Sequence, residues 1–253
     1  MKYMGSKSRI AKYIVPIIQK CIDENNITGY YEPFVGGANV IDKIKCQNRI
    51  GNDSNKYLIA FWQEMQNGLD LKSIQMDIDT YKEIRANKDN YPNYLVAIAG
   101  ILASYNAKWF GGYAKVHKVS DKCIRNYYRE SVDNVIAQMS NLQDVQFVCG
   151  DYRSITPHNT VVYCDPPYAN TIGYKDSIDY DEYWNWVREL SKDNIVLCSE
   201  YNAPSDFECI WEGQVTTTLD NASRAKATEK LFTYSHGKYA EYMNNCLTIF
   251  CMC

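Results

Sequence analysis

Tyr30-Tyr31-Glu32-Pro33-Phe34-Val35-Gly36-Gly37-Ala38-Asn39 is the stretch that decides the fold of this 253-residue chain. Its apolar first half predicts a strand, and the two glycines after Val35 predict a tight turn. The apolar residues that follow, Val40, Ile41 and Ile44, suit a helix. A strand, a glycine turn and a helix in this order indicate the start of an α/β fold.

Further strands and helices are predicted on both sides of this unit. Residues 7–24 carry isoleucines at helical spacing and predict a helix with an irregularity at Pro16. Residues 49–53 predict a second strand that ends on Asp53. Later apolar segments predict strands at 145–149, 161–164, 195–199 and 247–251, and a helix at 181–190. Strands that alternate with helices predict a mostly parallel, doubly wound sheet.

A segment of different character interrupts this alternation. Residues 61–130 show mostly helical patterns and few runs of β-branched residues. At roughly 150 residues per domain, the length allows one large domain that carries an insertion. We therefore expect one α/β domain built from residues 1–60 and 131–253, into which a mainly helical region, residues 61–130, is inserted.

The composition excludes several classes of protein. The chain holds 27 Lys and Arg against 30 Asp and Glu, a net charge of −3, and 46% hydrophobic residues. Its longest nearly apolar run, 95–103, is much shorter than the ~20 residues of a membrane span, and residues 1–3 open no apolar signal segment. We therefore expect a soluble, cytoplasmic protein with no membrane partner, and a monomer in solution.

The ten cysteines and three histidines do not predict a metal site. The cysteines are scattered, form no Cys-x-x-Cys pair, and have no histidine at ligand spacing. Segments such as 146–149 and 161–164 place a cysteine in an apolar stretch, so we interpret these cysteines as small core side chains in a reducing compartment. The mildly acidic balance does not decide the partner, because a local basic patch can still bind phosphate.

Val161-Val162-Tyr163-Cys164-Asp165-Pro166-Pro167-Tyr168 is the most informative string for function. Two prolines after an apolar strand end its hydrogen-bond ladder, at the position where open α/β sheets bind ligands. The Asp165 carboxylate and the Pro166 carbonyl would present two acceptors beside the ring of Tyr168. Two acceptors and a ring suit a planar base that carries an amino group. A strand-terminating turn with a structural aspartate is the alternative.

Several other motifs occur in a fixed order around this one. They are Lys2-Tyr3-Met4-Gly5-Ser6-Lys7, Glu32-Pro33-Phe34-Val35-Gly36-Gly37-Ala38, Asn52-Asp53, Gly150-Asp151-Tyr152 and Glu229-Lys230-Leu231-Phe232. In this order the chain resembles the Dam-like, alpha-group DNA adenine methyltransferases that use S-adenosylmethionine, especially their phage-encoded members. The resemblance covers nearly the whole chain and implies a Rossmann-like class I methyltransferase with an inserted target-recognition region.

The resemblance implies methyl transfer from S-adenosylmethionine to the exocyclic amino group of adenine in duplex DNA, which leaves S-adenosylhomocysteine. The catalytic residues it implies are Asp165, Pro166, Pro167 and Tyr168. The amino nitrogen is a poor nucleophile because its lone pair is delocalised into the ring. Acceptors on both amino hydrogens would aim that lone pair at the methyl group for in-line displacement. The adenine is expected to be flipped out of the duplex and to stack on Tyr168.

The resemblance also implies a set of cofactor contacts. These fall on Tyr3, Lys7, Glu32, Pro33, Phe34, Gly36, Gly37, Asp53, Asp151 and Asp165. The glycines would let the backbone approach the cofactor, and Asp53 would bond its ribose hydroxyls. The family pattern usually has glycine where Ala38 stands. As alternatives, Asp53 would be an N-cap for the helix from Asn55 onward, and Asp151 would cap a turn.

The insertion is expected to contact the DNA. Interleaved charged and aromatic residues are typical of surfaces that neutralise phosphates and contact bases. The candidates are Lys108, Phe110, Tyr113, Lys115, Arg125 and Arg129, together with Arg224 and Lys226 near the catalytic motif. A solvated basic face is the alternative. The recognition hairpin of Dam is not clearly reproduced, so no target sequence is predicted.

Two groups of rival functions stay open. The first keeps the chemistry and changes the acceptor to the cytosine amino group, an RNA adenine or a glutamine amide in a protein. The second is an inactive homologue that only binds DNA. The intact Asp165, Tyr168, Asp53 and Lys7 favour an active enzyme.

Overall fold

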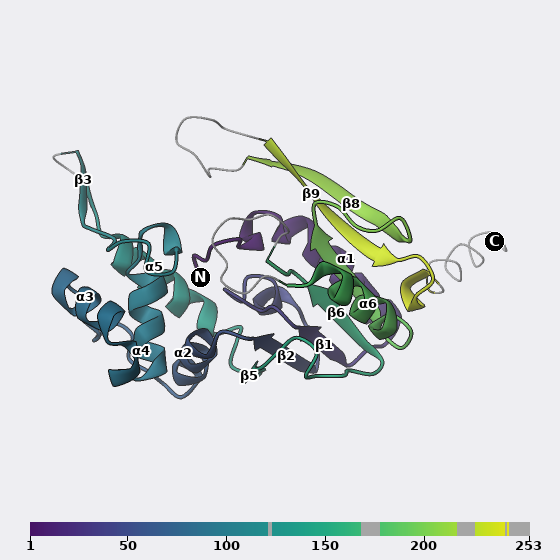
Figure 1. Cartoon of the computed structure of the whole chain (residues 1–253), viewed down its shortest axis with the longest axis horizontal. Coiled ribbons are helices and arrows are strands. Elements are labelled where there is room, and N and C mark those ends of the chain that lie inside the picture. The colour runs from purple at the N-terminus through teal and green to yellow at the C-terminus, as the bar shows by residue number, and fades with distance from the viewer. Residues whose placement is uncertain (121–122, 168–177, 217–225, 241, 243–253) are drawn as a thin grey trace. The chain divides into compact units, whose positions relative to one another are not determined.

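The structure is a computed structural model that describes residues 1–120, 123–167, 178–216, 226–240 and 242, and Figure 1 shows its α/β fold. The helices are η1 (Lys7–Arg9), α1 (Ala11–Glu24), η2 (Ile41–Lys43), α2 (Lys56–Gln66), α3 (Ile78–Ala86), η3 (Lys88–Asn90), α4 (Asn93–Ala97), η4 (Ile98–Leu102), η5 (Tyr105–Ala107), α5 (Tyr127–Met139) and α6 (Tyr180–Leu190). The strands are β1 (Gly29–Glu32), β2 (Asn48–Asp53), β3 (His117–Ser120), β4 (Cys123–Arg125), β5 (Val145–Cys149), β6 (Thr160–Cys164), β7 (Ile195–Glu200), β8 (Phe207–Thr216) and β9 (Lys226–Tyr234).

Seven of these strands form one mixed sheet in the order β5-β2-β1-β6-β7-β9-β8. β6 pairs in parallel with both β1 and β7, whereas β9 is antiparallel to β7 and β8. When β3 and β4, which form a separate hairpin, are left out of the count, the order reads 3-2-1-4-5-7-6. The order reverses between β1 and β6. Open α/β sheets bind their ligands at such a switch point, beyond the carboxyl ends of the strands.

The chain divides into two compact units, and β2 contributes residues to both. The first unit is Met1–Ser6, Val35–Lys43 and Gly51–Asp151, and the second is Lys7–Phe34, Ile44–Ile50 and Tyr152–Cys253. The insertion expected at 61–130 lies wholly within the first unit.

The core of the second unit is built on β6 and β7, both buried along their whole length. Buried strands of this kind are typical of parallel sheets covered on both faces. α6 places Tyr183 and Val187 against this core, and its N-cap Asp179 accepts from two backbone N–H groups. The predicted helix at 7–24 is confirmed as η1 followed by α1, which continues through Pro16.

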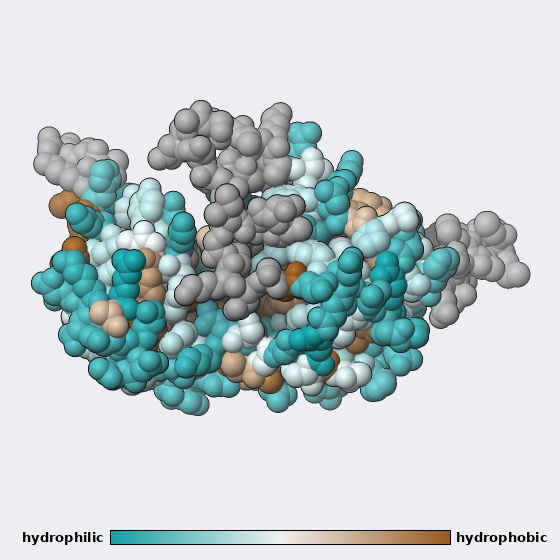
Figure 2. All heavy atoms as spheres, viewed as in Figure 1, coloured by the Kyte–Doolittle hydropathy of each residue, from teal (hydrophilic) through white to brown (hydrophobic). Residues whose placement is uncertain are grey.

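The core of the first unit is mainly helical, as the sequence predicts. Trp62 of α2 stacks on Phe147 of β5, with ring centroids 5.6 Å apart. The sequence did not predict the antiparallel hairpin of β3 and β4, which stands away from α3 and α4 in Figure 1. Val116 and Ile124 are 55% and 69% exposed there, and Figure 2 shows hydrophobic surface at this hairpin.

Three expectations are corrected or fall outside the described ranges, and two strands were not expected. A helix was expected after the glycine turn, but the chain forms only the 3₁₀ turn η2 there. A few residues later the Asn48 amide donates to the Thr28 carbonyl, where β2 begins, so little chain remains for a longer helix. The strands β8 and β9 were not predicted. Cys149 is exposed at the end of β5, so it is not the core side chain we expected, whereas Cys164 is buried. The strand expected at 247–251 lies outside the described residues.

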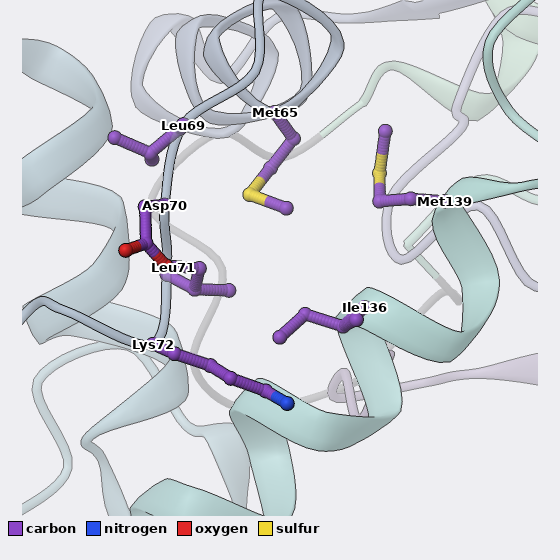
Figure 3. A pocket seen from close by; sticks show the side chains of 7 residues that line it. All are labelled: Met65, Leu69, Asp70, Leu71, Lys72, Ile136 and Met139. Carbon is purple, nitrogen blue, oxygen red and sulfur yellow. The ribbon is translucent and has the colours of Figure 1, made fainter.

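A cavity of about 330 Å³ lies within the first unit (Figure 3). Its lining comes from the end of α2, the following loop and α5. Most of these side chains are apolar, and the charged ones, Asp70 and Lys72, are exposed. None of them is among the residues expected to bind the cofactor, the adenine or the DNA.

Candidate active site

The end of β6 holds the first group of expected site residues. β6 is buried up to Cys164, and Asp165 follows with 20% of its side chain exposed. The Lys7 ammonium group lies 3.1 Å from Oδ1 of Asp165 and 3.4 Å from Oε2 of Glu229 on β9. The Lys7 side chain is only 7% exposed. A buried ammonium group is thus shared by two carboxylates, next to the switch point of the sheet.

The electrostatics of this group are set by burial and by its own charges. Burial raises the pKa of Asp165 to about 6, against the lowering effect of Lys7, and the Glu229 carboxylate raises it further. Burial by itself would lower the pKa of Lys7, but Asp165 and Glu229 outweigh it and raise that pKa. At neutral pH the site therefore presents an ionised Asp165 beside an ammonium group.

A second acid lies close to the prolines of the motif. Glu200, at the end of β7, is almost fully buried, and its Oε2 lies 3.2 Å from the Tyr180 hydroxyl. The same hydroxyl donates to the carbonyl of Pro167. Burial raises the pKa of Glu200 to about 7, and Asp165 adds to the rise. The sequence did not indicate Glu200 or Tyr180, since neither belongs to one of the motifs.

The glycine turn in the first unit holds the second group. The Gly36 amide donates to Oδ2 of Asp53 at 3.0 Å, and Gly36 has a φ of +46°. A Cβ at Gly36 would lie 3.0 Å from the Tyr3 ring, and one at Gly37 would lie 2.7 Å from Tyr3 Cβ. Tyr3 therefore packs directly on the turn, where side chains larger than hydrogen do not fit.

Asp53 was expected either to bond the ribose hydroxyls of the cofactor or to cap the following helix, and its contacts distinguish these two roles. Its Oδ1 accepts from the Asn55 amide at 2.9 Å, but Asn55 itself caps α2 by accepting from Tyr57 and Leu58. The N-cap role therefore belongs to Asn55. Burial raises the pKa of Asp53, and the amides of Asn55 and Gly36 partly offset that rise. Each carboxylate oxygen has a second lone pair, so the residue retains capacity to accept from a ligand hydroxyl.

Two distant side chains hold the carbonyls of this turn. The indole N–H of Trp62 donates to Gly36 at 3.1 Å. The Gln138 side-chain amide, on α5, donates to the carbonyls of Gly37 at 3.2 Å and Ala38 at 2.6 Å. Ala38 has a φ of +53° and is fully buried, so it adopts the left-handed conformation that favours glycine. Neither Trp62 nor Gln138 had been singled out from the sequence.

The other expected cofactor residues have more varied surroundings. Glu32 is buried, and its Oε1 accepts from the Tyr30 hydroxyl at 2.7 Å. Pro33 is buried, and the ring of Phe34 packs 5.3 Å from that of Tyr152. Asp151 is exposed. Tyr168 and Arg224 lie outside the described residues, and the described part of Lys226 is its backbone at the start of β9.

The expected DNA-contacting residues differ in accessibility. Lys108 and Lys115 are exposed, whereas Phe110 is buried against Tyr81. The remaining three are held by hydrogen bonds: Tyr113 donates to Met76, Arg125 to both carboxylate oxygens of Glu130, and Arg129 to Lys72 and Gln75.

The described ranges contain neither a metal-binding cluster nor a membrane-spanning helix. No cluster of three or more His, Cys, Asp or Glu side chains there could hold a metal ion. No helix of that part of the chain combines the length and hydropathy of a membrane span.

Sheet order and site together define a class of protein. A Rossmann-like sheet in the order 3-2-1-4-5-7-6, with an Asp-Pro-Pro turn at the switch point and an acid after the second strand, is that of a class I methyltransferase. The chain belongs to the D12 class N6 adenine-specific DNA methyltransferase family, whose model matches residues 3–204. Membership of a methyltransferase family implies that S-adenosylmethionine is the methyl donor.

Curated relatives agree with this assignment. The chain is 25% identical to modification methylase StsI of Streptococcus sanguinis and 24% identical to type II methyltransferase M.FokI of Planomicrobium okeanokoites. Each alignment covers 75% of this chain and 32% of the relative, so the chain spans about a third of their length. It is also 24% identical to type II methyltransferase M.MjaIII of Methanocaldococcus jannaschii, over 84% of this chain and 87% of that protein.

Proposed function

We propose that this chain transfers a methyl group from S-adenosylmethionine to the exocyclic amino group of adenine in duplex DNA. The observation that carries the proposal is the position of the Asp165 carboxylate at the end of β6, 3.1 Å from the buried ammonium of Lys7. That carboxylate accepts one amino hydrogen of the adenine, and the carbonyl of Pro166 accepts the other. Both acceptors stabilise the positive charge that develops on the nitrogen as it attacks the methyl carbon. The bond between that carbon and the sulfonium sulfur breaks, S-adenosylhomocysteine leaves, and the methylated nitrogen releases one proton to solvent.

The glycine turn is the proposed cofactor site. Gly36 and Gly37 leave no room for a Cβ beside Tyr3, so the Tyr3 side chain packs directly on the backbone of the turn. Asp53 is half-buried, and its carboxylate is held in place by hydrogen bonds from two backbone amides. Its remaining lone pairs would accept hydrogen bonds from the ribose hydroxyls of the cofactor. S-adenosylmethionine supplies an electrophilic methyl group on a sulfonium. These residues fit a ligand of that kind because they offer acceptors and close backbone approach.

The first unit also carries the proposed DNA contacts. Lys108 and Lys115 are exposed, and the side chain of Arg125 is 44% exposed although it pairs with Glu130. Surface ion pairs of this kind are worth little, so Arg125 can exchange Glu130 for a phosphate at small cost. β3 and β4 form a two-stranded antiparallel ribbon, a shape that the major groove of DNA admits.

The direct test is methyl transfer by the purified chain. The protein is incubated with labelled S-adenosylmethionine and unmethylated duplex DNA, and the product is digested to nucleosides and mapped by sequence. We expect N6-methyladenine in one sequence context. Label in cytosine would move the acceptor, whereas label only in RNA or protein, or no label with intact cofactor binding, would reject the proposal.

A further inference from the structure

Trp109 is an exposed tryptophan on a loop of the first unit. It is 38% exposed, although its ring lies 5.4 Å from that of Tyr57 at 30° and meets Phe110 edge-on at 4.9 Å. Tyr57 lies in the first turn of α2. The two neighbouring rings restrict the position of the tryptophan while more than a third of it faces solvent.

The loop that carries Trp109 is fixed by its own backbone. The Tyr105 amide donates to Gly112 at 2.8 Å, which closes the loop, and the Phe110 amide donates to Gly100 at 3.0 Å. The Gly112 amide donates to the Tyr81 hydroxyl at 3.2 Å. The buried ring of Phe110 thus anchors a rigid loop from which Trp109 projects.

This loop holds unfavourable backbone conformations. Asn106, Ala107 and Phe110 all have φ values near +50°, in the left-handed region. Asn tolerates this region better than other residues with a side chain, so the unfavourable conformations are those of Ala107 and Phe110. Strain of this kind persists where the surrounding structure enforces it, and it is concentrated at binding and catalytic sites.

The support below the loop is also specialised. Gly100 lies in η4, which is a π-helical turn. A Cβ at Gly100 would lie 2.5 Å from Cζ3 of Trp109 and 2.8 Å from Cε2 of Phe110, so both rings need a glycine there. π-helical turns are rare and are frequently found at functional sites.

Lysines surround these rings. The Lys56 ammonium lies 5.0 Å from the Tyr57 centroid, and that of Lys88 lies 5.2 Å from the Phe110 centroid. Lys56 directly precedes Tyr57 in the chain, Lys108 directly precedes Trp109, and both lysines are exposed. Aromatic faces interleaved with cations are the features by which proteins hold unstacked bases and their phosphates.

We propose that Trp109 stacks on a nucleobase of the DNA substrate, with Lys56 and Lys108 contacting flanking phosphates. The inference rests on the proposed function and adds a base-contacting residue to it. A stacked base explains why a strained loop, a π-helical turn and a glycine together present one tryptophan to solvent.

The test is DNA binding by Trp109→Ala and Trp109→Phe over a range of salt concentrations, with S-adenosylhomocysteine bound. We expect Trp109→Ala to weaken binding about 5- to 100-fold, the loss typical of one stacked base, and Trp109→Phe to retain part of the affinity. The dependence of log K on log salt should not change, because no charge is removed. Lys108→Ala should instead make that slope shallower by about 0.9.

Trp211→Ala is the matched control, because Trp211 forms another tryptophan–tyrosine stack, with Tyr13 at 5.7 Å, on β8. It should leave DNA affinity within about twofold. Unchanged DNA affinity in Trp109→Ala would overturn the inference, as would a loss confined to cofactor affinity. If the wild type methylates DNA in either of those cases, only the inference fails. If the wild type methylates no DNA, the proposed function fails.

Discussion

The ammonium group of Lys7 lies 3.1 Å from the carboxylate of Asp165, and both side chains are largely removed from solvent. One residue comes from the start of the chain and the other from the end of β6. The same ammonium group lies 3.4 Å from Glu229. The protonation state of Asp165, and therefore its ability to accept a hydrogen bond from an amino group, depends on these two neighbours.

Replacing Lys7 should shift the pH dependence of methyl transfer. Lys7 lowers the pKa of Asp165, which is about 6 in its presence. In Lys7→Met that pKa should rise by about 1–3 units, so the acidic limb of the kcat/KM profile should move to higher pH. The measurement is kcat/KM between pH 5 and 9, with circular dichroism as a check on folding. An acidic limb that stays in place would show that Asp165 does not control activity.

Replacing Glu229 should have the opposite effect. The Glu229 carboxylate raises the pKa of Asp165. In Glu229→Gln the acidic limb should therefore move to lower pH, by about 1 unit or less. The same pH series measures it. A shift in the same direction as that of Lys7→Met would mean that Glu229 acts only through packing.

Removing the Gln138 amide should weaken cofactor binding. Gln138→Met leaves the Gly37 and Ala38 carbonyls without this donor, which costs about 1–3 kcal/mol and loosens the turn. We expect a higher dissociation constant for S-adenosylmethionine by calorimetry. Gln66→Met is the matched control, since the Gln66 side-chain amide also donates to backbone carbonyls, those of Leu142, Gln143 and Val145. It should lower stability without changing cofactor affinity; equal effects on affinity would remove the special role of Gln138.

Adding a methyl group at Gly36 should disturb the turn more than the same change elsewhere. Gly36→Ala introduces strain at a φ of +46° and brings Cβ within 3.0 Å of the Tyr3 ring. Gly68→Ala introduces strain at a φ of +92° but meets no atom within 4 Å. Gly68→Ala should lose about 1–2 kcal/mol of stability by thermal unfolding and Gly36→Ala more than that, and only Gly36→Ala should lose cofactor affinity. Full affinity in Gly36→Ala would place the cofactor away from this turn.

The buried Glu200 should make stability depend on pH. Its pKa is about 7 in the folded protein and near 4.5 when unfolded, so the folded state binds more protons between these values. The contribution of this carboxyl to stability is therefore present below pH ~4.5 and lost as the pH rises through ~7. Glu200→Gln should gain thermal stability relative to the wild type at pH 8 but not at pH 4. A difference that does not vary with pH would contradict the raised pKa.

Much of the fold is predictable because its buried strands are distinctive. β5 and β6 are short apolar segments with clear boundaries, and the predicted strands match them to within one residue. β8 and β9 were missed because they are half-exposed, and β8 contains a bulge between Cys209 and Trp211. Both strands are stabilised by antiparallel pairing with their neighbours in the sheet, which a local sequence pattern does not reveal.

Only those site residues that belong to recognisable sequence motifs could be predicted. Asp165, Gly36 and Asp53 lie next to prolines, glycines or strand ends, which are visible in sequence. Trp62 and Gln138 act on the glycine turn from 26 and about 100 residues away, and the chain folds them into place through α2 and α5. No local pattern marks such residues. Phe110 is an example of a local pattern that misleads. It was expected to contact DNA because it is an aromatic residue within a basic stretch, but its ring is buried.

The central claim is that the Asp165 carboxylate holds the amino group of the target adenine during transfer. Single-turnover methyl transfer to duplex DNA by Asp165→Ala and Asp165→Asn, alongside S-adenosylmethionine binding, tests it most directly. The account predicts that transfer falls by about 10²-fold or more while cofactor binding is at least partly retained. Transfer at the wild-type rate by either variant would contradict it.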